Sequence, residues 1–215
     1  MKDNMKKILL LLLFSSGLAF SQNYLDEGNN LLSENRFVEA EQVFKKALNQ
    51  EPDNLIFKSQ LALALIDQNK NDQAEKVIVE ILKVDPLFTA ALWYGGINNF
   101  SRNRPDFRKA ISYFEKSYSL IDKSSGQYFA VNFFIGKSYR NLLYQEGLSY
   151  DEVSRMLETY KKYVELQPDA EDTDEIKKFI IKIEQSRPGK NVKRWAIATT
   201  VQSADKMIKN ELNEK

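Results

Sequence analysis

Residues 28–52 read GNNLLSENRFVEAEQVFKKALNQEP, and residues 62–86 read ALALIDQNKNDQAEKVIVEILKVDP. The two stretches have the same length, and each ends in a proline. Small and apolar residues precede both prolines at the same distances, namely Gly28, Leu31, Ala40, Phe44 and Ala47 before Pro52, and Ala62, Leu65, Ala74, Ile78 and Ile81 before Pro86. A period of about 34 residues with such fixed phases is typical of helix–turn–helix units that stack into a solenoid. The sequence therefore predicts a repeat architecture that presents an extended surface.

Less regular copies of the same pattern follow. Apolar residues three and four positions apart predict two helices in each of four units, over 22–53, 54–86, 87–122 and 127–168. The third unit has a turn about two residues longer than the rule, and the fourth has about eight extra residues around 144–150, which predict an enlarged turn or extended helix ends. Ser149 and Glu152 have capping-box spacing for the last helix of the array.

After Pro168, residues 169–215 show two more helical patterns. They run from Asp172 to Gln185 and from Arg194 to Leu212, each with one apolar face. A solenoid needs an end cap with a polar outer face, so we expect these helices to cap the array.

Residues 1–21 have the pattern of a secretory signal. Three lysines precede the unbroken apolar run Ile8–Phe14, and small residues at Ala19 and Ser21 predict cleavage before Gln22. The alternative is an uncleaved anchor, but the run is shorter than the ~20 residues that a spanning helix needs. We therefore expect an exported protein, periplasmic or secreted, with no integral membrane segment after cleavage.

Composition restricts the partners and the chemistry. Without residues 1–21 the chain has 28 basic and 29 acidic residues, which gives no long-range attraction to nucleic acid. It contains no cysteine, so neither disulfides nor lipid attachment at a cysteine is expected. Histidine is also absent, and the lack of both residue types removes the most common general base, the usual soft metal ligands and the thiol nucleophile. No glycine-rich phosphate loop occurs, and we expect no enzyme activity, no metal and no cofactor.

The repeated residues resemble the tetratricopeptide-repeat pattern over roughly residues 22–168. The residues that carry this resemblance are Tyr24, Gly28, Leu31, Ala40, Phe44, Ala47 and Pro52, then Leu61, Ala62, Leu65, Ala74 and Pro86, then Gly96, Ala110 and Phe114, and finally Gly136, Tyr139, Tyr160 and Pro168. The resemblance implies an all-α, right-handed α-solenoid of about four antiparallel helix pairs. It also implies a concave groove lined by the first helix of each pair, where members of the family usually bind peptides or partner proteins. The signal pattern is similar to that of exported proteins of Gram-negative bacteria.

Transferred onto this sequence, the groove positions of units three and four are rich in aromatic residues. Aromatic side chains beside a cation are the usual composition of binding hot spots. The predicted partner-binding groove consists of Trp93, Tyr94, Ile97, Phe133, Lys137 and Arg140. The alternative is that these rings belong to the hydrophobic core, because aromatic residues at helical spacing occur in both settings.

The predicted function is a non-catalytic exported scaffold that binds a partner protein or an extended peptide. Two alternatives remain, a self-associating structural component of the cell envelope that pairs through residues 195–212, and a carrier that holds a small ligand in the aromatic groove. A basic cluster at Arg187, Lys190, Lys193 and Arg194 is interpreted as solvated flanking charge rather than as a docking patch.

Overall fold

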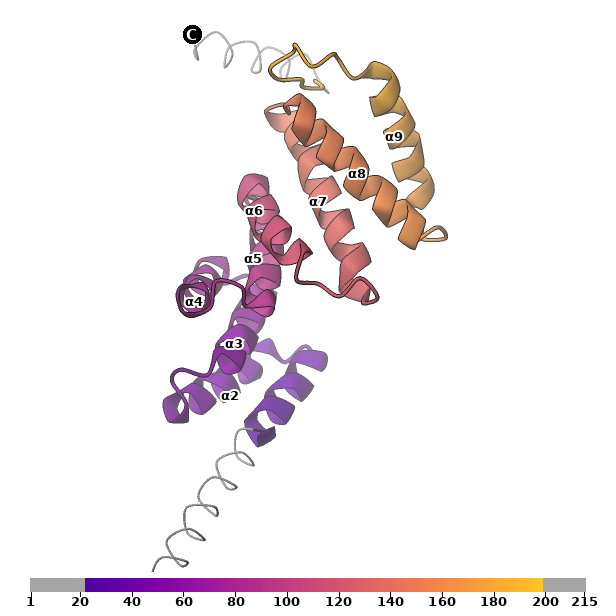
Figure 1. The fold of residues 1–215 in the computed structure, drawn as a ribbon. Coiled ribbons are helices and arrows are strands. Elements are labelled where there is room, and N and C mark those ends of the chain that lie inside the picture. Colours follow the sequence, from indigo (N-terminus) through magenta and orange to yellow (C-terminus); the bar gives the residue numbers. More distant parts are fainter. Residues whose placement is uncertain (1–21, 199–215) are drawn as a thin grey trace, which may run out of the picture. The chain divides into compact units, whose positions relative to one another are not determined.

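The computed structural model describes residues 22–198, and within them nearly all regular structure is helical (Figure 1). The predicted signal, residues 1–21, and residues 199–215 lie outside the described residues. A first helix covers residues 22–33. It is followed by α2 (Phe37–Gln50), α3 (Leu55–Asp67), α4 (Asn71–Val84), α5 (Thr89–Ser101), α6 (Phe107–Tyr118), α7 (Gly126–Gln145), α8 (Tyr150–Leu166) and α9 (Thr173–Ser186). The expected all-α fold of consecutive helix pairs is confirmed.

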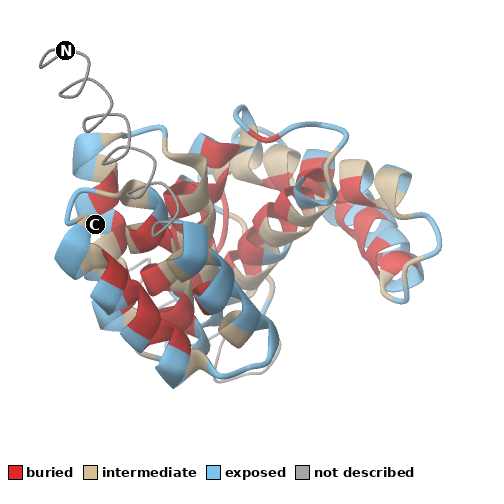
Figure 2. Cartoon of the chain, turned by 90° about the horizontal axis from the view of Figure 1, so that it is seen from below, coloured by how far each residue is buried: buried red, intermediate tan, exposed pale blue. Residues whose placement is uncertain are grey.

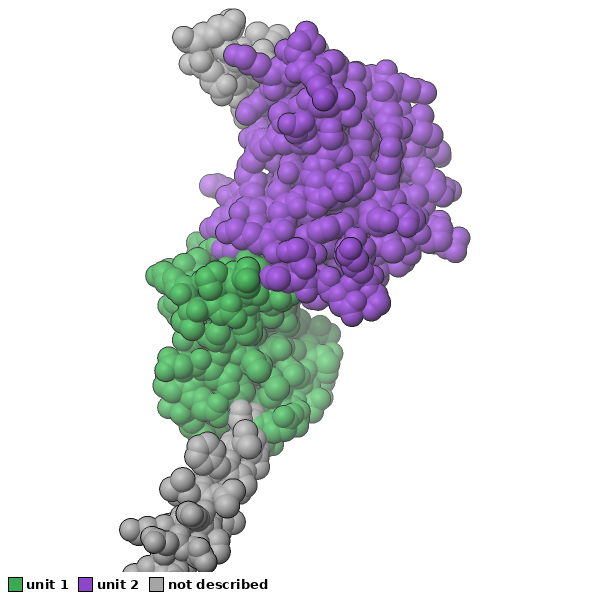
Figure 3. Space-filling view, viewed as in Figure 1, with its two compact units in different colours: residues 1–94 green, residues 95–215 purple. Residues whose placement is uncertain are grey.

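The described chain divides into two compact units, one on each side of the boundary between Tyr94 and Gly95, which Figure 3 colours green and purple. The boundary falls inside α5, after Tyr94, and not at a predicted repeat boundary. In the first unit α3 packs against both α2 and α4, and in the second unit α7 packs against both α6 and α8, with α9 against α8. The buried residues form stripes along these helices, shown in red in Figure 2.

Close approach of paired helices explains the small residues of the repeat. A Cβ atom added to Gly28 would lie 2.3 Å from Cζ of Phe44, and one added to Gly96 would lie 2.3 Å from Cε1 of Phe114. Gly136 has the same relation to Tyr160, at 2.7 Å from Cδ1. Each ring on the second helix therefore occupies the space that a side chain on the first helix would need.

The turns of the first two repeats are built in the same way. Asn35 and Asn69 occupy equivalent positions in the two repeats, and both have a φ of 59°. The residue after each asparagine donates its N–H to a leucine carbonyl of the preceding helix, from Arg36 to Leu31 at 2.8 Å and from Lys70 to Leu65 at 2.9 Å. Asparagine tolerates this left-handed conformation, which satisfies the carbonyls at the end of a helix.

The irregular fourth repeat is accommodated by a long helix. The structure extends α7 to 20 residues, which absorbs most of the surplus chain, and the helix is followed by Gly147, with a φ of 81°. The capping box is confirmed: the Ser149 hydroxyl accepts from the N–H of Glu152, and the Glu152 carboxylate accepts from the N–H of Ser149. Arg108 on α6 also contacts this carboxylate.

The second C-terminal helical pattern is wrong at its beginning, because Arg194–Ala198 are not helical. Trp195 instead forms an antiparallel bridge with Leu148, with two backbone hydrogen bonds of 2.8 Å. A side chain at Gly147 would obstruct this pairing, since its Cβ would lie 2.8 Å from Cγ of Arg194 and 3.0 Å from the oxygen of Trp195. We call residues 187–198 the strap. The rest of the predicted helix, and with it most of the predicted self-association surface, lies outside the described residues.

The basic cluster is more than solvated charge. The guanidinium of Arg187 lies 3.7 Å from the ring centroid of Tyr150 and donates to the Tyr150 carbonyl at 2.9 Å. Lys190 lies over the same ring at 5.3 Å. The interpretation as solvated charge is therefore wrong for Arg187, whose side chain attaches the strap to the start of α8, whereas Lys190 is exposed.

Candidate functional site

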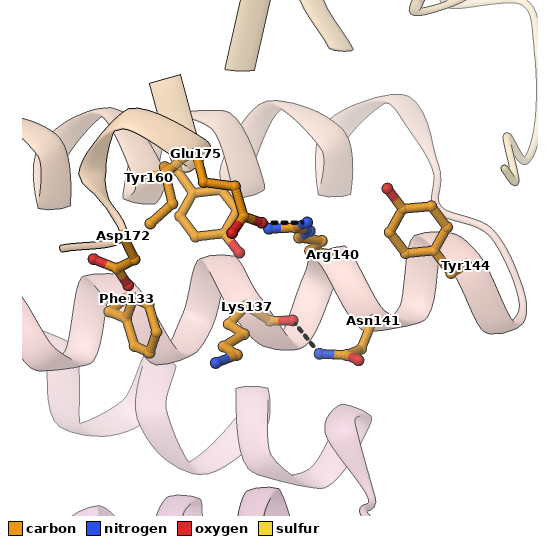
Figure 4. Close-up of a pocket in the computed structure, with 9 residues that line it drawn as sticks. Phe133, Lys137, Arg140, Asn141, Tyr144, Tyr160, Asp172 and Glu175 are labelled. Atoms are coloured by element: carbon orange, nitrogen blue, oxygen red, sulfur yellow. Dashed lines mark hydrogen bonds and ion pairs between the residues drawn. The ribbon is translucent and has the colours of Figure 1, made fainter. Parts of the chain in front are cut away.

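The second unit has a cavity of about 390 Å³ between α7 and the start of α9, with α8 behind it (Figure 4). We call it the α7–α9 pocket. Its lining residues come from three helices and the turn before α9, and they are Phe133, Lys137, Arg140, Asn141, Tyr144, Tyr160, Asp172, Glu175 and Ile176. The volume lies within the usual range for ligand pockets, ~300–1,000 Å³.

One face of α7 supplies one wall of the pocket. Phe133, Lys137, Arg140 and Tyr144 are spaced by four, three and four residues, so they follow one another along a single side of the helix (Figure 4). The neighbouring residues Val131, Ile135 and Leu142 are buried instead. The amphipathic pattern of α7 thus places its core residues on one side and its pocket residues on another.

Arg140 connects the two sides of the pocket. Its Nη2 donates to Oε1 of Glu175 on α9 at 2.9 Å, and its guanidinium lies 4.6 Å from the centroid of the Phe179 ring. Burial acts to lower the pKa of Arg140, but the hydrogen bond to Glu175 and the nearby negative charge outweigh it and raise the pKa. Arg140 is therefore a fixed cation, held between a ring and a carboxylate.

Lys137 is the solvent-accessible cation of the pocket. Its Nζ lies 4.9 Å from the centroid of the Phe133 ring, and the side chain is exposed. Unlike Arg140, it forms no salt bridge with any residue in the range 22–198. The ring of Phe133 is supported from behind by Tyr163, with centroids 5.1 Å apart. A cation next to an aromatic face is thus available to a ligand.

The floor of the pocket is Tyr160, which is 1% exposed. Burial raises the pKa of its hydroxyl, and the neighbouring Arg140 opposes this increase only in part. The hydroxyl is therefore neutral at physiological pH. Asp172 at one edge accepts a hydrogen bond of 2.8 Å from the Tyr163 hydroxyl, which fixes this carboxylate on the turn before α9.

Comparison with known proteins identifies the fold. The sequence model of the tetratricopeptide repeat matches residues 31–94. A crystal structure of the MamA protein is similar to this chain with a TM-score of 0.60 and 17% identity, covering 91% of this chain and 93% of that one. A MamA RS-1 double mutant gives a TM-score of 0.61 at 14% identity, covering 91% and 97%. MamA 41-end from Desulfovibrio magneticus RS-1 gives 0.57 at 15% identity, covering 79% and 98%.

The chain has the tetratricopeptide-repeat fold. The matched segment, residues 31–94, contains most of the two regular repeats, whereas the pocket lies in the degenerate fourth repeat and its cap. Identities of 14% and 17% to the MamA structures support the similarity of fold and nothing further.

The six predicted groove residues of this repeat protein belong to both units. Phe133, Lys137 and Arg140 are brought together in the α7–α9 pocket. Trp93 and Tyr94 lie in the first unit and Ile97 in the second, all on α5 and half-buried, and they are not part of this pocket. Burial raises the pKa of Tyr94, and the carboxylate of Asp67 raises it further. The assignment of the six residues to a partner site remains a prediction.

Several pocket residues were not predicted from the sequence. Asn141 and Tyr144 continue the spacing of Lys137 and Arg140 by one helical turn, so the same periodicity could have identified them. Asp172, Glu175 and Ile176 belong to the cap, which carries no signal in the repeat pattern. Their position depends on how α9 packs against α8, which a short sequence period does not encode.

The pocket is suited to recognition. It offers one fixed cation, one accessible cation, two carboxylates and three rings, in an arrangement that can contact both apolar and charged groups. Within residues 22–198, no cluster of three or more acidic, cysteine or histidine side chains is placed to hold a metal. No helix within these same residues has both the length and the apolar character needed to cross a bilayer.

Proposed function

We propose that this protein is an exported, non-catalytic scaffold that binds a partner protein or an extended peptide, and that the α7–α9 pocket is part of its binding surface. Repeat proteins of this kind generally act by presenting a surface and not by catalysis. The observation that supports the proposal best is that Phe133, Lys137 and Arg140, selected as groove residues, line one pocket.

The physical argument rests on how the pocket is constructed. Binding hot spots combine rigid aromatic or arginine anchors with a surrounding that excludes water. Arg140 is held by Glu175 and Phe179, and Phe133 is held by Tyr163, so neither loses much side-chain freedom when a ligand binds. Lys137 supplies a charge that no acidic residue of the described chain neutralises.

Export is proposed from the sequence pattern of residues 1–21 alone. Fusion of these residues to a reporter enzyme that is active only outside the cytoplasm, followed by N-terminal sequencing, would test it. Reporter activity with a new N-terminus at Gln22 is the expected result, and an intact N-terminus on a cytoplasmic reporter would contradict it.

A random heptapeptide library displayed on phage is a suitable probe of binding. We expect peptides selected on the parent protein to bind at least tenfold more weakly to the Phe133→Ala and Lys137→Glu variants. Ser112→Glu, at an exposed position of α6 outside the pocket, is the control and should bind normally. Peptides that bind all four proteins equally would contradict the assignment of the pocket.

The pocket volume supports a small ligand as a second candidate. About 390 Å³ is enough for a small molecule, and the aromatic walls suit an apolar or ring-shaped one. Native mass spectrometry of the protein purified from its own cells should then show a bound mass that Phe133→Ala removes. A spectrum with only the protein mass would count against this candidate.

A further inference from the structure

Two of the charges that line the α7–α9 pocket are already neutralised by each other. The charged lining residues are Lys137, Arg140, Asp172 and Glu175. Arg140 and Glu175 form an ion pair, with 2.9 Å between nitrogen and oxygen. Within residues 22–198, neither Lys137 nor Asp172 forms a salt bridge. Among the described residues, the pocket therefore presents one uncompensated cation and one uncompensated carboxylate to a ligand.

These two charges lie at different places along the pocket. Asp172 is on the turn before α9, where it accepts from the Tyr163 hydroxyl at 2.8 Å. The Tyr163 ring packs on Phe133 with 5.1 Å between centroids, and Nζ of Lys137 lies 4.9 Å from the same Phe133 centroid. Figure 4 shows Asp172 beside Phe133, with Lys137 one turn further along α7. The pocket thus has a negative end and a positive end, joined by an aromatic surface.

The charges around the start of α9 reinforce this polarity. Residues 169–178 include five charged side chains that do not line the pocket, namely Asp169, Glu171, Asp174, Lys177 and Lys178. Asp174 and Lys177 form a salt bridge at 3.6 Å, so Asp169 and Glu171 outnumber the remaining lysine. The positive end of the α9 dipole opposes these carboxylates, but it amounts to only about half an elementary charge. A cationic group of a ligand is therefore favoured at the Asp172 end.

The length of the pocket suits a peptide better than a single amino acid. Phe133 and Tyr144 are eleven residues apart on α7, which at a helical rise of ~1.5 Å per residue corresponds to about 16 Å. An extended peptide advances ~3.3 Å per residue, so about five residues match this wall. Alternate side chains of such a peptide point to the same face. Two charged side chains of one short segment can therefore be directed at the same wall.

We propose that the α7–α9 pocket binds a dipolar peptide segment, with a basic side chain at Asp172 and an acidic side chain at Lys137. This inference rests on the proposed function and specifies the ligand of that function. A segment with charge of a single sign is attracted at one end of the pocket and repelled at the other, whereas a dipolar segment is attracted at both. An apolar residue of the same segment can pack on Phe133 and exclude water from the two ion pairs.

The sequences selected from the heptapeptide library test the proposal. We expect the peptides whose binding requires Phe133 to carry one basic and one acidic residue, in a constant order and at a constant spacing. A second peptide is then synthesised with these two residues exchanged, so that both peptides have the same composition and net charge. The exchanged peptide should bind the parent protein about tenfold more weakly, because two attractive ion pairs become two repulsive ones.

Reversal of the pocket charges should reverse this preference. Lys137→Glu combined with Asp172→Lys exchanges both signs at constant net charge, and this chain should bind the exchanged peptide more tightly than the original one. The matched control is Lys161→Glu with Glu184→Lys, which reverses an ion pair between α8 and α9 outside the pocket and should keep the preference of the parent. If the folded charge-reversed chain prefers the same peptide as the parent, the proposal is overturned.

Two neutral variants keep the test decisive if the charge-reversed chain does not fold. Asp172→Asn retains an oxygen that can accept from Tyr163, and Lys137→Gln retains a long polar side chain. Each variant is combined with peptides that lack either the basic or the acidic charge, in double-mutant cycles. We expect coupling of about threefold between Asp172 and the basic residue and between Lys137 and the acidic residue. Additive losses in both of these cycles would overturn the proposal.

The outcomes separate the dipolar ligand from the proposed function. Selected peptides that require Phe133 but lack paired opposite charges would overturn the dipolar ligand and leave the scaffold function in place. A library that yields no peptide dependent on Phe133 would contradict the assignment of the pocket in the proposed function, and the dipolar ligand with it.

Discussion

At the scale of single residues, the contact between the two helices of a repeat depends on which small residue faces which large one. Gly28 faces Phe44, Gly96 faces Phe114 and Gly136 faces Tyr160. The second repeat has Ala62 and Ile78 at the equivalent positions, and both are fully buried. The second repeat therefore combines an alanine with a branched aliphatic side chain, whereas the other three repeats each combine a glycine with an aromatic ring.

This pairing predicts a compensated double variant. Gly28→Ala should destabilise the protein, since overpacking typically costs ~1–3 kcal/mol and outweighs the better helix propensity of alanine. Adding Phe44→Ile should recover part of the loss, because it recreates the combination of the second repeat. Urea unfolding of the two single variants and the double variant gives the coupling energy. Additive effects would show that the two positions do not share the same space.

The asparagine turns predict a second effect. Asn69 has a φ of 59°, which costs a residue with a Cβ ~1–2 kcal/mol unless its side chain compensates locally. Asn69→Ala should therefore destabilise the protein by about 1 kcal/mol, and Asn69→Gly should be neutral or stabilising. Thermal unfolding of both variants measures this, and equal losses would indicate that the turn does not depend on the left-handed conformation.

At the scale of elements, a buried carboxylate connects α2 to the turn between α3 and α4. Glu41 is 6% exposed and accepts hydrogen bonds from Lys45 at 2.5 Å, Lys70 at 2.7 Å and Gln68 at 2.9 Å. Burial acts to raise its pKa, but these three donors together outweigh it and lower the pKa to about 2. The charged form of Glu41 therefore stabilises the folded first unit.

The sign of the pH dependence follows from the direction of this shift. A carboxylate whose pKa is lower in the folded state contributes stability above its unfolded pKa, near 4.5, and the contribution is lost as the pH falls toward 2. Glu41→Gln should lower the melting temperature at pH 7, and the difference from the parent should shrink below pH 4.5. A difference that stays constant from pH 7 to pH 3 would be inconsistent with the ionised group.

At the scale of the whole molecule, the chain consists of two compact units, and the most extensive contacts between helices join neighbours in sequence. In repeat proteins stability is approximately the sum of unit stabilities and nearest-neighbour terms. Gly136→Ala, which places a Cβ 2.7 Å from Tyr160, should therefore increase hydrogen exchange in α7 and α8 while the amides of α2 and α3 keep their protection. A uniform increase over residues 22–198 would indicate one cooperative unit.

Some elements of this fold can be predicted from the sequence and others cannot, for physical reasons. Gly28, Pro52 and Ala62 encode local pairings of adjacent helices, and their regular recurrence makes them visible. The helix predicted from Arg194 was wrong at its start because backbone pairing with Leu148, which lies far earlier in the chain, replaces the helical hydrogen bonds. An amphipathic pattern cannot reveal such a long-range competitor.

For the same reason, only half of the predicted groove residues line the pocket. Lys137 and Arg140 were found because they share a face of one helix, and they line the pocket. Glu175 escaped because its place opposite Arg140 depends on the packing of the cap. Trp93 and Tyr94 are aromatic like Phe133, so residue type alone predicted all three for the same binding site. They do not line this pocket, because residue type does not specify which surface a side chain belongs to.

The bridge between Leu148 and Trp195 also has a consequence for the order of events during synthesis. Each helical hairpin can form as soon as its second helix has left the ribosome, because its contacts join neighbouring elements. The site around Gly147 is different, since Arg194, Trp195 and Ala196 emerge only after all of α8 and α9. Until translation has passed residue 197, the nascent chain leaves the carbonyls of Leu143 and Leu148 without these partners. Among the described residues, the pairing of Trp195 and Ile197 therefore returns the chain to the end of α7, which was made much earlier in translation.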